Sequence, residues 1–482
     1  MSFKERISNA PKKKWIRMFI VNILCLLFVI WSGYYLLLLL IPVFFDCYIT
    51  KYIPWGFWRK SENRVFRKAM EWVDAILFAL IAVYFINTFF FQNYQIPSSS
   101  LEKSLLVGDF LFVSKMTYGS RAPLTPFSFP LAQHTLPWLN IKSYLDKPQL
   151  KYKRLPGGRE IKRGDIVVFN FPAGDTVAVK RQSEDYYSLC MGNPEGREGI
   201  WKNTAEYGEV VYRPVDRREN YVKRCIGLPG ETIELRNDTT FIDGNPVEDP
   251  KHVQRLYAIQ TDGTIISPAV LEELNMSNAE KNLMSPPVYI NDKDSMTIEA
   301  YGLKWNDGNT GLLYQYVFLS ADMVKILEKK KFILSIVRQN HIFKVERRRP
   351  NSPIYPVTYP QRVFPGDFPP LWIPKSGSTI RFDENVDYKV AAYHRCIRNY
   401  EHNEFDYRDG KVFINGKQAD SYTFKYDSFF MMGDNRDNSA DSRTWGFVPE
   451  DHVVGSPVFI WLSIDKDKGK IRWDRIFTSA SK

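Results

Sequence analysis

Cysteine is scarce in this sequence. Only five occur in 482 residues, namely Cys25, Cys47, Cys190, Cys225 and Cys396. The first two lie in or beside apolar segments, and the other three form neither a metal-spaced pair nor a dense disulfide framework. A bridge between Cys225 and Cys396 is conceivable in an oxidising compartment, but free buried thiols are the interpretation we favour.

The sequence also lacks the motifs of several common protein classes. It has no Gly-x-Ser-x-Gly run, and its six histidines are scattered without a partnering motif, which argues against a Ser-His-Asp hydrolase. It has no recognisable RNA- or DNA-binding motif despite a formal net charge of +11. Lys/Arg clusters at residues 12–17 and 59–68 flank apolar segments, so we assign much of the basicity to membrane topology and predict no nucleic-acid partner.

Long apolar runs are confined to the first hundred residues. Residues 18–45 exceed the roughly 20 residues that a spanning helix needs, yet two full spans do not fit. This segment is therefore one tilted or broken helix, or a re-entrant hairpin. A cleaved signal peptide is disfavoured because the run is too long and no small-x-small cleavage site follows it. Residues 75–91 form a second run near the short end for a span.

The basic residues predict an orientation for this anchor. The loop at residues 51–68 should stay in the cytoplasm, so residues after Phe91 should lie outside it. By the same rule Lys12, Lys13 and Lys14 also belong inside, which leaves the topology of residues 18–45 in conflict. We predict that residues 1–91 are a membrane anchor with one or two transmembrane segments.

Beyond residue 91 the sequence predicts a mostly β protein. Short apolar runs, such as residues 165–169, are separated by Gly, Pro and Asp. Asp-Gly at 243–244 and Asn-Gly at 415–416 fit hairpin turns. They follow Lys223-Arg-Cys-Ile and His394-Arg-Cys-Ile runs, an echo that chance or duplication explains equally well. We predict an antiparallel β catalytic domain at 92–235 and 420–482, with a β-rich or α+β subdomain inserted at 236–419 that holds a helix near 320–331.

Three segments carry candidate chemistry: residues 94–109, 220–231 and 432–446. Taken singly, each has an ordinary interpretation: a polar loop, a solvated strand or an acidic loop. The third lacks the glutamate spacing of an EF-hand calcium loop. Together and in this order they resemble the signature boxes of the type I signal peptidases, the bacterial leader peptidases that use a Ser-Lys dyad. Residues 163–168 and 454–475 resemble further strands of that family.

The resemblance implies a role for each site residue. Ser100 corresponds to the nucleophile and Lys223 to the general base. Ser98 corresponds to an oxyanion-hole donor, Ser439 to the residue that orients the lysine, and Asp441, Arg443 and Gly433 to the support behind the site. Substrate-binding positions correspond to Gln95, Ile96, Tyr221 and Val222. The run from Leu101 to Leu105 departs from the family pattern, because Glu102 and Lys103 put charges near the nucleophile and a usual proline is missing.

The chemistry requires an uncharged lysine. A serine hydroxyl becomes a good nucleophile only when a neighbouring base takes its proton. The ordinary lysine pKa of about 10.4 must therefore fall, and burial lowers it by penalising the ammonium. Tyr221, Val222, Cys225 and Ile226 surround Lys223 in sequence with few acids, and Arg224 should point to the opposite strand face.

The resemblance implies a bacterial inner-membrane enzyme whose catalytic domain is extracytoplasmic. Its expected partners are exported preproteins, cleaved after a small-x-small motif, and membrane lipid, with the translocation machinery as a further candidate; we expect a monomer without cofactor or metal. Two alternatives stay open. One is a catalytically degenerate homologue that acts as a membrane-anchored scaffold. The other is a β-lactamase-like enzyme, because Ser100 and Lys103 spell Ser-x-x-Lys, although neither Ser-x-Asn nor Lys-Thr-Gly follows.

Overall fold

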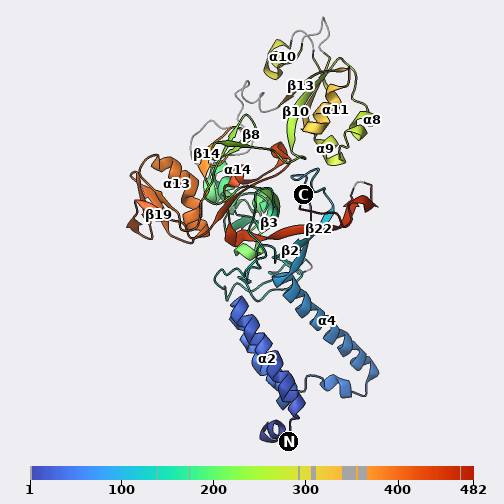
Figure 1. Ribbon diagram of the computed structural model, residues 1–482, viewed down its shortest axis with the longest axis vertical. Helices are drawn as coiled ribbons and strands as arrows, with labels where there is room; N and C mark the ends of the chain where they lie inside the picture. The colour runs from blue at the N-terminus through green and yellow to red at the C-terminus, as the bar shows by residue number, and fades with distance from the viewer. Residues whose placement is uncertain are drawn as a thin grey trace. The chain divides into compact units, whose positions relative to one another are not determined.

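The computed structural model describes residues 3–137, 139–172, 174–290, 294–304, 311–338, 354–356, 366–466 and 468–481 (Figure 1). The chain forms two compact units, one of residues 1–92 with 115–160 and one of residues 93–114 with 161–482. Parts of the predicted insertion, at 291–293, 305–310, 339–353 and 357–365, lie outside the described residues.

The first unit is built on helices, with short helical turns labelled η. They are α1 (Phe3–Ser8), α2 (Lys12–Ser32), η1 (Tyr35–Leu39), α3 (Leu40–Phe45), η2 (Asp46–Thr50), η3 (Phe57–Lys60) and α4 (Arg64–Phe89). By length and composition, α2 and α4 could each cross a membrane, and most of their apolar side chains are exposed. Asn63 caps α4 by accepting from the backbone amides of Val65 and Phe66.

The first apolar segment is not one continuous helix. Gly33 ends α2 in the left-handed conformation (φ 67°), and its N–H donates to Val29 O at 2.7 Å. The chain then returns along α2 through η1, α3 and η2. Near the turn Cys25 Sγ lies 3.6 Å from Leu37 O, and near the start of α2 the rings of Trp15 and Phe45 are 6.1 Å apart. Residues 12–50 therefore form a helical hairpin, the folded-back alternative left open above.

Residues 115–160 belong to the same unit as these helices. They hold few regular elements, and an apolar cluster joins them to the helix ends. Tyr34, Phe89 and Leu155 are its buried members, and Tyr84 Oη donates to Pro126 O at 2.6 Å. The ends of α2 and α4 are thus tied to one irregular segment.

The second unit contains an eight-stranded sheet in the order β1-β2-β22-β3-β6-β20-β21, with β23 beside β22. Its pairings of known register are antiparallel. This confirms the predicted mostly β fold behind an N-terminal helical anchor. The strands are β1 (Phe91–Gln95), β2 (Asp109–Ser114), β3 (Ile166–Asn170), β6 (Asn220–Gly227), β20 (Ser428–Met432), β21 (Val448–Pro449), β22 (Val453–Asp465) and β23 (Lys470–Ile471).

Two smaller sheets contain the predicted hairpins. One has the order β14-β7-β8-β9 and the other β16-β17-β18. Their strands are β7 (Thr232–Arg236), β8 (Thr239–Ile242), β9 (Asn245–Val247), β14 (Phe368–Trp372), β16 (Phe405–Arg408), β17 (Lys411–Ile414) and β18 (Lys417–Gln418). Asp243, Gly244, Asn415 and Gly416 have φ of 50°, 79°, 52° and 76°, so each pair forms the tight turn that right-twisted strands favour.

The sequence echo does not extend upstream of these turns. Lys223–Ile226 lies in strand β6, whereas His394–Ile397 lies in α13 (Val386–Arg395) and η6 (Cys396–Tyr400). Two segments that adopt different secondary structures favour the chance explanation. All five cysteines are free, and Cys225 and Cys396 are buried thiols, as expected.

A four-stranded sheet of order β11-β12-β10-β13 lies within the predicted insertion. We call this sheet and its helices the inserted lobe: β10 (Gln254–Thr261), α8 (Pro268–Glu273), α9 (Asn278–Leu283), β11 (Val288–Tyr289), α10 (Ser295–Tyr301), β12 (Leu312–Ser320), α11 (Ala321–Glu328) and β13 (Ile333–Arg338). Helix α11 is the helix predicted near 320–331. Ser320 caps it by accepting from the amide of Met323, and Met323 and Leu327 pack into the lobe's core.

The remaining elements are shorter. They are β4 (Thr176–Ala178), η4 (Val179–Arg181), α5 (Tyr186–Gly192), α6 (Gly196–Lys202), α7 (Thr204–Tyr207), β5 (Val210–Tyr212), η5 (Val215–Arg217), β15 (Thr379–Arg381), β19 (Ser421–Thr423), η7 (Arg436–Asn438), α14 (Ser442–Trp445), η8 (Glu450–His452) and η9 (Trp473–Arg475).

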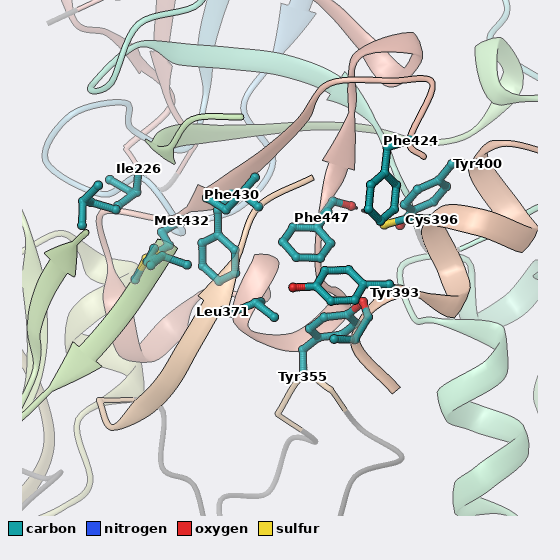
Figure 2. Close-up of a cluster of buried hydrophobic side chains, with 14 of the residues drawn as sticks. Ile226, Tyr355, Leu371, Tyr393, Cys396, Tyr400, Phe424, Phe430, Met432 and Phe447 are labelled. Atoms are coloured by element: carbon teal, nitrogen blue, oxygen red, sulfur yellow. Dashed lines mark hydrogen bonds between the residues drawn. The ribbon is translucent and has the colours of Figure 1, made fainter. Parts of the chain in front are cut away.

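One apolar cluster joins the large sheet to its neighbours. Figure 2 shows Ile226 and Met432 of the large sheet at one end and Tyr393 and Tyr400 of α13 and η6 at the other. Residues of β7, β8 and β14 also belong to this cluster. The cluster contains residues from both sides of residue 235, where we predicted the first segment of the catalytic domain to end. The predicted domain limits therefore stay a prediction.

Candidate active site

The candidate nucleophile lies in a tight loop between β1 and β2. Ser100 begins a turn that two buried side chains anchor, since Leu101 and Leu105 are each only 1% exposed. Their burial against Val168 and Ile460 fixes the loop on the sheet. Ser100 itself is 9% exposed.

The candidate base reaches this loop from the middle of the sheet. Lys223 stands on β6, which pairs with β3 on one side and β20 on the other. Its side chain is buried, and its Nζ lies 2.5 Å from Ser100 Oγ. The fold therefore brings together two residues that are 123 positions apart in sequence.

Burial lowers the pKa of Lys223 to about 8 because it penalises the charged amine. The carboxylates of Asp441 and Asp434 oppose that effect, while the Arg443 guanidinium adds to it. The sequence neighbours of Lys223 include few acids, but they do not reveal which acids lie near it in the fold. Tertiary structure brings two carboxylates near the amine, but each is held by an arginine.

The first of these carboxylates belongs to a buried ion pair. Arg443 Nε donates to Asp441 Oδ1 at 2.9 Å, and Arg443 Nη2 donates to Oδ2 at 2.9 Å. Burial by itself would raise the pKa of Asp441, but Arg443 and the Gly433 amide hold it below the ordinary value. Burial is still the largest influence on the pKa of Lys223, and the Asp441 carboxylate opposes it.

Gly433 lies where two segments approach closely. A Cβ at this position would overlap Ser439 Oγ and would lie 2.6 Å from Ser100 O. The Gly433 amide donates to Asp441 Oδ2 at 3.1 Å. Only a residue without a side chain lets the end of β20 pass so near the loop that carries Ser100.

A second buried pair was missed by the sequence interpretation. Arg224 donates to both oxygens of Asp434, at 2.8 Å and 2.7 Å, and Ser104 Oγ donates to Asp434 Oδ2 at 2.6 Å. The expectation that Arg224 points to the face opposite Lys223 stays a prediction. Asn435 N then donates to Ser100 O at 3.0 Å. The only sequence signal for these contacts was the group of acidic and amide residues in the 432–446 run.

The two other predicted hydroxyls differ in burial. Ser98 is exposed in the bend that precedes Ser100. Ser439 Oγ is buried and has no hydrogen-bond partner among the described residues. Their roles in the oxyanion hole and in orienting the lysine stay predictions.

The predicted substrate-binding residues differ in exposure. Ile96 is buried in the cluster that holds Leu101, and half-buried Val222 packs against that cluster. Tyr221 stacks on Phe171 with 4.8 Å between ring centroids, while Gln95 is exposed on β1, the edge strand of the large sheet. An exposed residue on an edge strand is suited to pair with an extended peptide.

The two charges next to Ser100 face the inserted lobe. Lys103 Nζ lies 2.9 Å from Glu280 Oε2, in an ion pair. Glu102 is buried, and burial together with the nearby Glu280 carboxylate raises its pKa to about 7. An ammonium engaged by a carboxylate is a poor base, so the structure gives no support to the Ser-x-x-Lys alternative. Across the described ranges, no group of three His, Cys, Asp or Glu side chains could hold a metal.

Comparison with known proteins identifies the family. The chain matches the family described as signal peptidase, peptidase S26, over residues 69–353 and 395–462. The chain belongs to this family. The matched ranges contain every site residue discussed above.

Several curated relatives named signal peptidase I match this chain over most of their own length. A signal peptidase I of Helicobacter pylori (strain J99) is 38% identical over 434 residues, covering 87% of this chain and 94% of the relative. Signal peptidase I of Buchnera aphidicola (subspecies Baizongia pistaciae) is 23% identical over 403 residues, covering 82% and 79%. Signal peptidase I of Haemophilus influenzae is 21% identical over 430 residues, covering 87% and 78%.

Proposed function

We propose that this S26 peptidase is a membrane-bound signal peptidase I that cleaves exported preproteins after a small-x-small motif. Ser100 is the nucleophile and Lys223 the general base. The proposal rests mainly on the distance of 2.5 Å between the buried Lys223 Nζ and Ser100 Oγ. An amine with a pKa near 8 is partly neutral at neutral pH and can accept a proton.

The reaction proceeds in two stages. Neutral Lys223 takes the proton of Ser100 Oγ as that oxygen attacks the scissile carbonyl, and the Lys223 ammonium then protonates the departing amine. This step leaves the signal peptide as an ester on Ser100 and releases the mature protein. Lys223, neutral again, takes a proton from water as that water attacks the ester, and it then returns the proton to the departing Ser100 Oγ, which frees the signal peptide. The Ser98 hydroxyl and the Ser100 amide are the proposed donors to the oxyanion.

Specificity is proposed to come from pairing of the precursor with an edge strand. An extended chain places alternate side chains on one face. Main-chain bonding beside Gln95 would therefore aim two small side chains at shallow apolar surface near Ile96 and Val222. This arrangement matches a small-x-small requirement.

The anchor supports an extracytoplasmic catalytic domain. Because residues 12–50 fold back on themselves, Lys12–Lys14 and the basic loop at 51–68 lie at the same end of α2. Arg6 Nη1, just before α2, donates to Lys51 O at 2.6 Å. Both basic clusters can then stay in the cytoplasm. Helix α4 would carry the chain outward once, so residues after Phe91 would lie outside a bacterial inner membrane.

The test is cleavage of a purified preprotein by the full chain in detergent. Wild type should cleave after a small-x-small site, and Ser100→Ala and Lys223→Met should each lower kcat at least about a thousandfold. Lys389→Met, which breaks the partly exposed Lys389–Asp383 ion pair, is the matched control and should retain activity. A wild-type chain that binds the precursor without cutting it would favour the scaffold alternative.

A further inference from the structure

The loop that carries Ser100 contains an unfavourable backbone conformation. Lys103 has φ of 71°, in the left-handed region that residues with a Cβ rarely adopt. No proline lies between Ser100 and Leu106 to fix the turn. A conformation of this kind persists only where its surroundings hold it, and such positions concentrate at functional sites.

The surroundings of Lys103 come from the inserted lobe. Lys103 Nζ donates to Glu280 Oε2 at 2.9 Å and to Asn275 O at 2.6 Å. Glu280, on α9, is 1% exposed, and its carboxylate also accepts from Gln254 Nε2 at 2.5 Å and from Ser277 N at 2.6 Å. A carboxylate held by two lobe residues is a fixed partner for the loop amine.

The same lobe also contacts the segment behind Ser100. Gln254 N, at the start of β10, donates to Asp434 O at 2.8 Å, and Leu256 N donates to Asp437 Oδ2 at 2.8 Å. Asn435, between those two acceptors, holds Ser100 O. Helix α9 therefore binds the loop that follows Ser100, and strand β10 binds the segment at 434–437 that holds the Ser100 carbonyl.

We propose that the inserted lobe is a positioning element of the active site, and that Glu280 acts through Lys103 to fix the loop bearing Ser100. This inference rests on the proposed peptidase function. Neither residue touches the reacting atoms, so both are positioning residues. Their loss should affect the rate of the chemical step more than precursor binding.

The test compares kcat and KM for preprotein cleavage by the full chain. Lys103→Met and Glu280→Gln should each lower kcat about tenfold, because a small misplacement of the nucleophile slows the reaction steeply. KM should change less than about twofold. The kcat of the double variant, Lys103→Met with Glu280→Gln, should be no lower than that of the less active single variant. Lys103→Arg keeps the charge and should retain most of the activity. The pH midpoint set by Lys223 should not move in any of them.

Lys330→Met is the matched control, since it breaks a lobe ion pair with Glu273 that does not touch the loop. Its kcat should equal that of wild type. Unchanged kcat in Lys103→Met, an effect on KM alone, or equal losses in Lys103→Arg and Lys103→Met would overturn the inference. These outcomes are distinct from failure of the proposed function, in which wild type itself would not cleave.

Discussion

Lys223 has an ordinary pKa too high for the role of base that we propose for it. Its amine is buried on β6 and bonded to Ser100 Oγ, and burial lowers its pKa to about 8. Asp441 and Asp434 act in the opposite direction. The final pKa is a compromise in which burial dominates because both carboxylates are neutralised by arginines.

This compromise predicts a pH dependence. In the proposed mechanism the neutral amine is the active form, so kcat/KM should rise as the pH passes through about 8. In Asp441→Asn the carboxylate that favours the ammonium is gone, so the pKa of Lys223 falls and the midpoint should move to lower pH. The exchange also leaves Arg443 buried without its partner, which should lower the melting temperature.

The measurement is kcat/KM of preprotein cleavage between pH 6 and 10, a range of about two units on either side of the expected midpoint. Asp383→Asn, which removes an exposed carboxylate that pairs with Lys389, is the control and should leave the midpoint in place. A midpoint that moves to higher pH in Asp441→Asn would contradict the assignment of Lys223 as the titrating base.

At the scale of elements, the site depends on the approach of the turn after β20 to the turn after β1. Gly433 permits that approach because a Cβ there would overlap Ser439 Oγ and crowd Ser100 O. The Asn435 amide then holds the Ser100 carbonyl at 3.0 Å. The position of the turn after β1 therefore depends on the position of the turn after β20.

Gly433→Ala should push these loops apart and lower kcat about a hundredfold or more, since displacement of the nucleophile by about 1 Å is enough for such a loss. Gly192→Ala is the matched control, because a Cβ there would meet no atom within 4 Å. Both variants are assayed for preprotein cleavage and for thermal unfolding. Full activity in Gly433→Ala would show that the close approach is not required.

At the scale of the whole molecule, the helical hairpin of residues 12–50 resolves the conflict between the two basic clusters. A single passage of residues 18–45 would put Lys12–Lys14 and the 51–68 loop on opposite sides. A chain that turns back at Gly33 keeps them together. The positive-inside rule then applies to both clusters at once.

Free cysteines allow a direct test of this orientation. Cys47 is exposed near the start of η2, and Cys190 in α5 belongs to the other compact unit. In spheroplasts, a membrane-impermeant maleimide should label a variant that keeps only Cys190 and should spare one that keeps only Cys47. Permeabilisation should expose Cys47. Labelling of Cys47 in intact spheroplasts would exclude the proposed topology.

Local chemistry made several features predictable from sequence alone. The Asp-Gly and Asn-Gly hairpins, the helix near 320–331, the mostly β character and the apolar anchor all follow from contacts within a few residues. The pair Ser100 and Lys223 was predictable because the segments that carry them resemble a known family. The echo at His394 left chance and duplication open, because a four-residue run does not determine whether it forms a strand or a helix.

Relations between distant segments emerge only when the chain folds. The carboxylates near Lys223, the Arg224–Asp434 pair, the engagement of Lys103 by Glu280 and the return of residues 35–50 along α2 all join residues far apart in the chain. Sequence determines which groups can ionise, bond or turn. Their burial and their neighbours, which determine pKa and position, exist only once the chain has packed.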